Sequence, residues 1–199
     1  MVTNPNYIFW PEVNDRFLNV VEFPNYFSPQ ECDDIIKLGL EAETIQATIS
    51  QNKVIDTKYR DSKISWLECL YSNDWLWHKI NNIILEVNAK YYKYKLLGFR
   101  ECLQFTQYLG PGTHYNWHMD FGPGTMSIRK LSAVVQLSDE KDYRGGSLEL
   151  LYGADPFFAN KTRGTIIIFP SFTMHRVAPI SSGKRYSLVL WASGHEPYR

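Results

Sequence analysis

The chain has 199 residues with 21 basic and 21 acidic side chains, so its formal net charge is zero. This length suits one domain with a sizeable core, and the neutral balance argues against nucleic acid as a partner. Three cysteines without a CxxC pattern favour free thiols in a reducing compartment over a disulfide scaffold. No apolar run reaches membrane-spanning length and no signal peptide is recognisable, so we expect a cytoplasmic protein without membrane contact.

Two helices are predicted in the first half of the chain. Ser28-Pro29-Gln30-Glu31 combines an N-cap residue, a proline at the first helical position and a capping box, which predicts a helix from 29 to about 42. Ser72-Asn73-Asp74 indicates a second helix start by the same capping logic. Its apolar residues recur at helical spacing as far as about Tyr92, so we expect one face of this helix to pack on a sheet.

Short extended segments surround the first helix in this prediction. We expect strands at 17–23, 43–56 and 64–67, where β-branched and aromatic residues gather. The charged segment 58–63 is expected to be a solvated, mobile loop, which is the common behaviour of such segments.

From Leu97 onward the pattern changes to short strands divided by glycine-containing turns, including Ser181-Ser182-Gly183. Because helices come first and strands later, we expect a mainly β, α+β fold in which two helices buttress one sheet. Residues 1–199 are expected to form a single domain, with a helical and loop support at 1–96 and a β core at 97–193. The strands are predicted at 97–108, 114–120, 130–137, 146–152, 164–169, 174–178 and 184–192.

The residues His118 and Asp120 stand two apart in the predicted strand 114–120. Alternate side chains of a strand leave the same face, so the imidazole and the carboxylate would point to one spot. They would supply two thirds of a facial triad of two histidines and one carboxylate for Fe(II). His175, which comes 57 residues after His118, is the best candidate for a third ligand, although a lone histidine at a strand end more often bonds a backbone carbonyl.

An arginine, Arg185, comes ten residues after His175 and begins an otherwise apolar strand. If its side chain points inward it needs a partner, and its planar fork suits a carboxylate. It would then anchor an anion in the barrel; the alternative is an exposed arginine on an edge strand.

Together these residues resemble the Fe(II)- and 2-oxoglutarate-dependent dioxygenases, and most closely their prolyl 4-hydroxylase-like branch with its bacterial and phage members. The resemblance extends from Gln104 to Ser193. The motifs that carry it, in order, are Tyr108-x-Gly110, Tyr115-x-x-His118-x-Asp120, Arg129-x-Leu131-Ser132, Tyr143-x-Gly145-Gly146-x-Leu148-Glu149-Leu150, Gly164-x-x-x-x-Phe169-Pro170-Ser171, His175-Arg176-Val177-x-Pro179, Gly183-x-Arg185 and Trp191.

This resemblance implies a double-stranded β-helix, a variant of the jelly roll, with His118, Asp120 and His175 as iron ligands. Arg185 would hold the distal carboxylate of 2-oxoglutarate. Tyr108 matches a position where relatives often place a cosubstrate ligand, but a core aromatic role is about as common. Gln136 falls where relatives place a partner for the distal carboxylate, usually a tyrosine. The implied cofactors are Fe(II), 2-oxoglutarate and O₂, with ascorbate as an added reductant.

The reaction implied is hydroxylation of a C–H bond with release of succinate and CO₂. The ten-residue interval between His175 and Arg185 resembles that of the prolyl branch, whereas the nucleic-acid dealkylases have a longer interval and a second arginine. We therefore expect a prolyl residue in a peptide or protein as the substrate. In relatives a loop of the N-terminal half folds over the peptide, and segment 50–63, with Lys58, Arg60 and Lys63, is the candidate for that part; the alternative is a solvated charged loop. Trp117 and Trp191 are expected either to wall the pocket or to fill the core. The alternatives are a hydroxylase of a free amino acid or other small molecule, and a jelly-roll binding module without catalysis.

Overall fold

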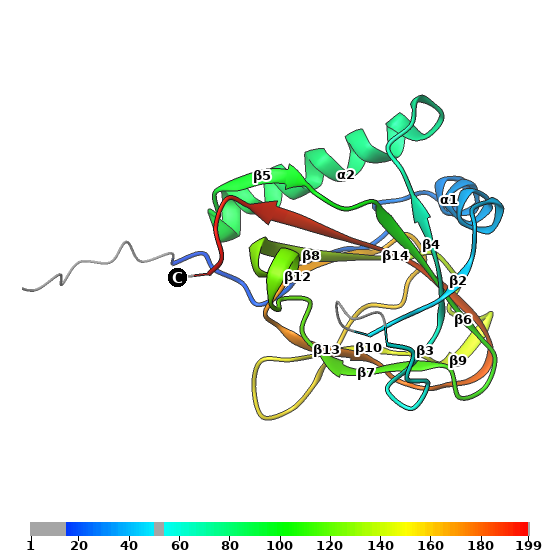
Figure 1. Ribbon diagram of the computed structural model, residues 1–199. Helices are drawn as coiled ribbons and strands as arrows, with labels where there is room; N and C mark the ends of the chain where they lie inside the picture. Colours follow the sequence, from blue (N-terminus) through cyan, green and yellow to red (C-terminus); the bar gives the residue numbers. More distant parts are fainter. Residues whose placement is uncertain (1–14, 50–53, 199) are drawn as a thin grey trace, which may run out of the picture.

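Two antiparallel sheets face each other and two helices cover the outer side of the larger one (Figure 1). The structure is a computed structural model that describes residues 15–49 and 54–198. The larger sheet has nine strands in the order β1-β12-β8-β14-β6-β4-β2, with β5 and β9 also pairing with β14. The smaller sheet has five strands in the order β11-β10-β13-β7-β3. The expected fold, mainly β with two supporting helices, is thereby confirmed.

The strands of the larger sheet are β1 (Val21–Phe23), β2 (Ile45–Gln46), β4 (Lys63–Leu67), β5 (Leu96–Phe99), β6 (Leu103–Leu109), β8 (Arg129–Gln136), β9 (Tyr143–Gly145), β12 (Ile166–Pro170) and β14 (Ile180–Gly194). Those of the smaller sheet are β3 (Arg60–Asp61), β7 (His114–His118), β10 (Leu148–Leu151), β11 (Phe157–Phe158) and β13 (Met174–Val177). The helices are α1 (Pro29–Glu41) and α2 (Asp74–Val87), with short turns η1 (Tyr71–Asn73), η2 (Asn88–Tyr92) and η3 (Gly124–Ile128).

Both predicted helices form where the sequence places them. In α1 the capping box is complete, because the Glu31 amide donates to the Ser28 hydroxyl and the Ser28 amide donates to the Glu31 carboxylate. The capping logic for α2 was wrong in detail. The Asn73 side chain makes no cap bond to this helix, since its amide group binds the Glu68 carbonyl and the Leu70 amide instead.

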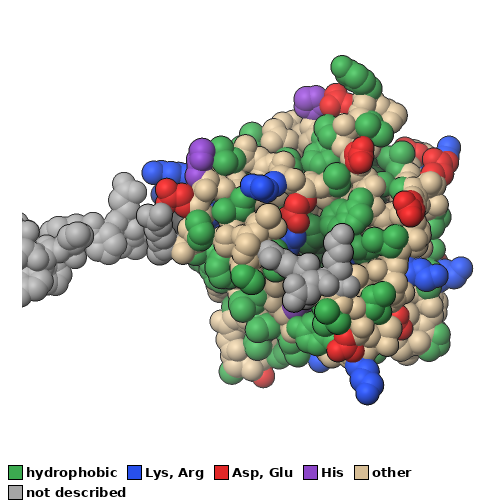
Figure 2. All heavy atoms as spheres, in the orientation of Figure 1, with side chains coloured by type: hydrophobic (Ala, Val, Ile, Leu, Met, Phe, Trp, Pro, Cys, Tyr) green, Lys and Arg blue, Asp and Glu red, His purple; other side chains and the backbone are tan. Residues whose placement is uncertain are grey.

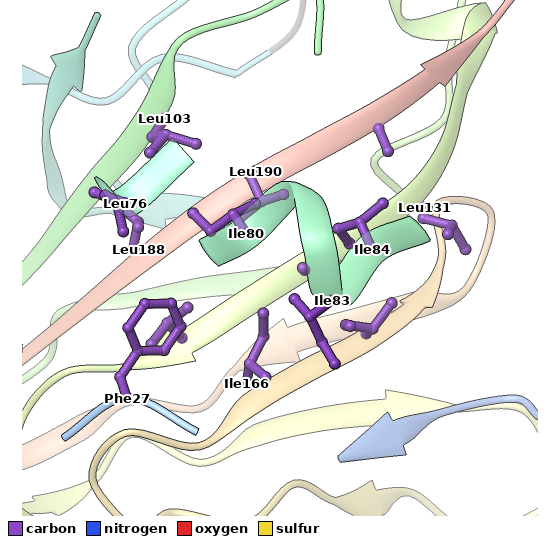
Figure 3. Close-up of a cluster of buried hydrophobic side chains, with 14 of the residues drawn as sticks. Phe27, Leu76, Ile80, Ile83, Ile84, Leu103, Leu131, Ile166, Leu188 and Leu190 are labelled. Carbon is purple, nitrogen blue, oxygen red and sulfur yellow. The ribbon is translucent and has the colours of Figure 1, made fainter. Parts of the chain in front are cut away.

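Alternate residues of the central strands enter two different cores, as the period of two in a strand requires. On β8, Leu131, Ala133 and Val135 pack toward the helices, whereas Val134 packs between the two sheets. The helix-side core is closed by an apolar stripe of α2 (Figure 3). The stripe consists of Leu76, Ile80, Ile83, Ile84 and Val87. Since the helices seal the outer face, the space between the sheets is left for a site.

Several predicted strand boundaries were wrong. The strand expected at 97–108 is two strands, β5 and β6, and only Ile45–Gln46 of segment 43–56 lies in a strand, with 50–53 outside the described residues. The predicted turn 181–183 lies within β14, which runs unbroken from Ile180 to Gly194. Gly183 has a φ of +82° there and would place a Cβ 2.0 Å from the Asp142 carbonyl oxygen. The glycine therefore serves a close backbone approach rather than a turn.

No helix among the described residues is both long and apolar enough to cross a membrane.

Candidate active site

The two histidines lie opposite each other on neighbouring strands of the smaller sheet. His118 on β7 pairs in register with His175 on β13, and their ring centroids are 4.1 Å apart. The Nδ1 atom of His118 lies 2.7 Å from the Asn116 carbonyl oxygen, and that of His175 lies 2.9 Å from the Thr173 carbonyl oxygen. A proton on Nδ1 satisfies each carbonyl and leaves the Nε2 lone pair of each ring free to bind a metal.

The carboxylate of Asp120 faces both Nε2 atoms but does not come from a strand. We predicted 114–120 as one strand, and β7 ends at His118. Asp120 is instead held by a turn, in which the amides of Asp120 and Phe121 both donate to the Ser171 carbonyl oxygen, at 3.0 and 2.9 Å. Its Oδ1 lies 3.8 Å from His118 Nε2, and its Oδ2 lies 3.5 Å from His175 Nε2.

The pKa values of His118 and Asp120 favour the protonation states that bind a cation. Burial and the neighbouring His175 lower the pKa of His118 to about 3, so the ring is neutral at pH 7. Burial alone would raise the pKa of Asp120, but the electrostatic interactions with His175, His118 and Arg129 and the hydrogen bond from Ser132 outweigh it and lower the pKa to about 2. A neutral imidazole beside an ionised carboxylate is the form in which such side chains bind metal ions.

The donor set fits an Fe(II) ion. The ligand atoms of His118, Asp120 and His175 all lie within 4.8 Å of one another, and all three side chains are largely buried. Two imidazole nitrogens and one carboxylate oxygen form the facial set that suits non-haem Fe(II) and leaves further positions open. The structure thus brings together the three residues that the sequence predicted as ligands.

Arg185 is a buried cation without an ion pair in the described part of the chain. Its side chain is 1% exposed, and its partners are neutral: the Gln136 Oε1 atom at 2.9 Å and the Ser187 hydroxyl at 3.4 Å. Among the described residues, its Nε has no hydrogen-bond partner. A buried guanidinium is costly unless an anion compensates it, so this end of the pocket is suited to a carboxylate, and the alternative of an exposed edge arginine is wrong.

Gln136 and Tyr108 both lie beside Arg185. Gln136 also donates from Nε2 to the Asn160 carbonyl oxygen at 3.3 Å, which fixes the orientation of its amide. The Tyr108 ring lies 5.2 Å from the guanidinium carbon, and burial raises the pKa of its hydroxyl. The structure therefore brings these two predicted residues to the anion-binding end, and Tyr108 is at the same time part of the core between the sheets.

A pocket of about 330 Å³ joins the histidine cluster to Arg185. Figure 2 shows hydrophobic side chains gathered around a hollow on one face of the molecule. Trp191 lines the pocket, which agrees with the first of the two roles expected for it. Trp117 does not; its ring packs against the Arg176 guanidinium at 4.7 Å. The pocket walls also include Ile64, Trp66, Gln104, Thr106, Val134, Val177, Ser187 and Val189.

Arg60 belongs to the pocket wall, although the sequence placed it in a charged loop that was at most a candidate cover for the substrate. We expected Arg60 in a solvated loop, but it lies in β3, is 6% exposed and lines the pocket. Its guanidinium lies 4.3 Å from the Tyr115 ring centroid, and its Nε donates to the Ser62 hydroxyl at 3.0 Å. Arg60, Ser62 and Ile64 are all buried, so an alternation continuing backward from the predicted strand 64–67 was the available signal.

Comparison with known proteins supports this geometry. Residues 103–193 match the family model of the 2OG-Fe(II) oxygenase superfamily. The chain is 38% identical over 85 residues to a PKHD-type hydroxylase of Synechococcus sp. (strain CC9605) and 40% identical over 86 residues to another of strain CC9902. Each match covers 42% of this chain and only 38% of the relative's own length.

Solved structures share the fold over most of the chain. A prolyl hydroxylase of Trichoplax adhaerens, in complex with a peptide of the hypoxia inducible factor, superposes with a TM-score of 0.72 at 19% identity, covering 88% of this chain and 83% of that one. A viral collagen prolyl hydroxylase from Paramecium Bursaria Chlorella virus-1, as a 2OG complex, gives 0.64 at 20% identity, covering 89% and 97%. All six predicted site residues fall within the matched segment 103–193, so the part of the chain that carries the candidate site is similar to the 2OG-Fe(II) oxygenase superfamily.

Proposed function

We propose that this chain is an Fe(II)- and 2-oxoglutarate-dependent hydroxylase that acts on a prolyl residue in a peptide or protein. The observation that carries the proposal is one pocket with two complementary ends. At one end are two imidazoles whose Nε2 atoms face one carboxylate, and at the other a buried guanidinium with only neutral partners. A dicarboxylate that binds a metal at one end and an arginine at the other matches both ends.

His118, Asp120 and His175 would hold the iron through the two Nε2 atoms and the carboxylate. The backbone carbonyls of Asn116 and Thr173 fix the two rings, so that both Nε2 atoms face the same point. When bound, Fe(II) with 2-oxoglutarate and O₂ supplies the oxidising power that converts a substrate C–H to C–OH, with release of succinate and CO₂. The protein's own task is to bind and orient the reactants.

Arg185 would bind the distal carboxylate of 2-oxoglutarate. Its fork offers charge-assisted hydrogen bonds in a buried setting, where they are stronger than in water. Gln136 holds the guanidinium in place through its Oε1 atom, and its own amide is fixed by the Asn160 carbonyl. Tyr108, buried next to the guanidinium, would close the side of this end against water.

The substrate would bind against aromatic side chains of the pocket wall. The rings of Trp66 and Trp191 line the pocket with centroids 6.3 Å apart, and such walls suit the flat, apolar face of a proline ring. The solved relatives named as prolyl hydroxylases, one of them bound to a peptide, support a peptidyl substrate. The zero net charge offers no attraction for a nucleic-acid backbone.

The test is succinate formation from 2-oxoglutarate with Fe(II) and O₂, in the presence of a library of proline-containing peptides. We expect a peptide-dependent rise in succinate and a matching gain of one oxygen on the peptide by mass spectrometry. Free amino acids assayed in parallel separate a peptide hydroxylase from a small-molecule hydroxylase. A protein that binds neither metal nor 2-oxoglutarate would instead be a non-catalytic binding module, and the proposal would be wrong.

A further inference from the structure

A buried hydroxyl contacts the carboxylate that the proposed function assigns to the metal. The Ser132 Oγ atom, on β8 of the larger sheet, lies 2.7 Å from Asp120 Oδ2. Ser132 is fully buried and Asp120 is 7% exposed, so water does not compete for this bond. Because an ionised carboxylate only accepts hydrogen bonds, the single Ser132 proton must be the one donated to Asp120.

A second serine stands behind the first. The hydroxyl oxygens of Ser132 and Ser171 are 3.0 Å apart, and Ser171 is also fully buried. Since the Ser132 proton is committed to Asp120, the Ser171 hydroxyl donates in this bond. The result is a chain of two aligned hydroxyls that ends on Oδ2, and such chains strengthen each of their bonds in a low-dielectric interior.

Ser171 also ties this chain to the backbone that carries the ligands. Its carbonyl oxygen accepts the amides of Asp120 and Phe121, and its amide donates to the Lys130 carbonyl at 3.0 Å. The tight turn that follows it is closed by the Thr173 amide on the Pro170 carbonyl. The Thr173 carbonyl in turn fixes the ring of His175. One turn therefore contacts two of the three candidate ligands.

We propose that Ser132, supported by Ser171, is a positioning residue that holds the Asp120 carboxylate toward the two Nε2 atoms before a metal arrives. Without the hydroxyl chain, Asp120 lies on a turn outside any strand and can rotate about its side-chain bonds. The entropy of that rotation would then be lost on metal binding. The inference rests on the metal site of the proposed function and assigns to Ser132 a role in building it.

The experiment compares Ser132→Ala, Ser171→Ala and a matched control, Ser65→Ala, by titrating the metal-free protein with Co(II). Ser65 is likewise a fully buried strand serine, and its hydroxyl bonds Thr44 at 3.1 Å, away from the candidate ligands. We expect Ser132→Ala to raise the Co(II) dissociation constant by about ten- to a hundredfold, the usual effect of losing a partner of a metal ligand. Ser171→Ala should cause a smaller rise, and Ser65→Ala none.

Thermal unfolding of the metal-free variants separates positioning from general loosening. The proposal requires Ser132→Ala and Ser65→Ala to lose similar stability while only the first loses Co(II) affinity. It is overturned if Ser132→Ala binds Co(II) within threefold of the wild type, or if Ser65→Ala weakens Co(II) to the same extent. If the wild-type protein binds no Co(II), the metal site is wrong and this inference falls with it. If the wild type binds Co(II) and Ser132→Ala binds it equally well, only the role of Ser132 is overturned.

Discussion

Replacement of Arg185 by methionine tests the anion-binding end of the pocket. The guanidinium is buried with two neutral partners and an unsatisfied Nε, so it has free donors for a carboxylate. Hydrogen bonds to charged groups contribute about 1.5–3 kcal/mol each, and a bidentate pair contributes roughly 3–6 kcal/mol. At about 1.4 kcal/mol per tenfold change, Arg185→Met should weaken 2-oxoglutarate binding by roughly two to four orders of magnitude.

The assay is calorimetric titration of 2-oxoglutarate into the Mn(II)-loaded protein. The 2-oxoglutarate affinity of Arg185→Lys should lie between those of the wild type and Arg185→Met, because lysine keeps the charge but lacks the planar fork. Arg144→Met is the matched control, since Arg144 is exposed and its recorded hydrogen bond is to the neighbouring Tyr143 carbonyl. Mn(II) affinity should be unchanged in all three variants. If Arg185→Met binds 2-oxoglutarate within threefold of the wild type, Arg185 is not the anchor.

Three further predictions concern the metal ligands and the fold. Asp120→Ala should raise the Co(II) dissociation constant at least a hundredfold, because it removes the one charged ligand of the candidate set; unchanged Co(II) binding would exclude Asp120 as a ligand. The pKa of His118 is 6.5 in the unfolded chain and about 3 in the folded chain, so the unfolded state binds more protons between these two pH values. The metal-free protein should therefore lose stability as the pH falls from about 6.5. Thermal unfolding from pH 7 to 4 checks this, and His118→Leu should flatten the profile. Gly39→Ala would place a Cβ 2.2 Å from Phe105 Cγ, and denaturant unfolding should show a loss of about 1–3 kcal/mol; wild-type stability would mean that Phe105 can move aside.

Local sequence signals predicted the parts of the fold that depend on neighbouring residues. The capping box at Ser28 fixes the start of α1 because its two hydrogen bonds join residues three apart. The apolar residues of β8 and β12 marked buried strands for the same reason, since this signal also lies in neighbouring residues. The family motifs added the order of the site residues, which composition and periodicity do not contain. The single-domain boundaries at 1–96 and 97–193 stay a prediction.

Features made by contacts between distant segments were not predictable in this way. Arg60 is buried because β3 pairs with β7, where Arg60 lies opposite Tyr115, and the local alternation into Ile64 does not say which distant strand is the partner. Asp120 reaches the histidines from a turn held by Ser171, 51 positions along the chain. The period-two argument for His118 and Asp120 therefore reached the right pair of residues by a wrong geometry.

The two ends of the pocket come from different sheets, so the fold must keep the two sheets at a fixed spacing. Both histidines belong to the smaller sheet, whereas Arg185, Gln136 and Ser132 belong to the larger one. The spacing between the metal ligands and the anion anchor therefore depends on how the sheets pack, through residues such as Phe169 and Leu150. Ser132 links the two sheets, because it lies on the larger sheet and its hydroxyl donates to Asp120, which lies in the turn after β7 of the smaller sheet. A substitution in the inter-sheet core could thus impair 2-oxoglutarate binding while leaving each set of ligands intact.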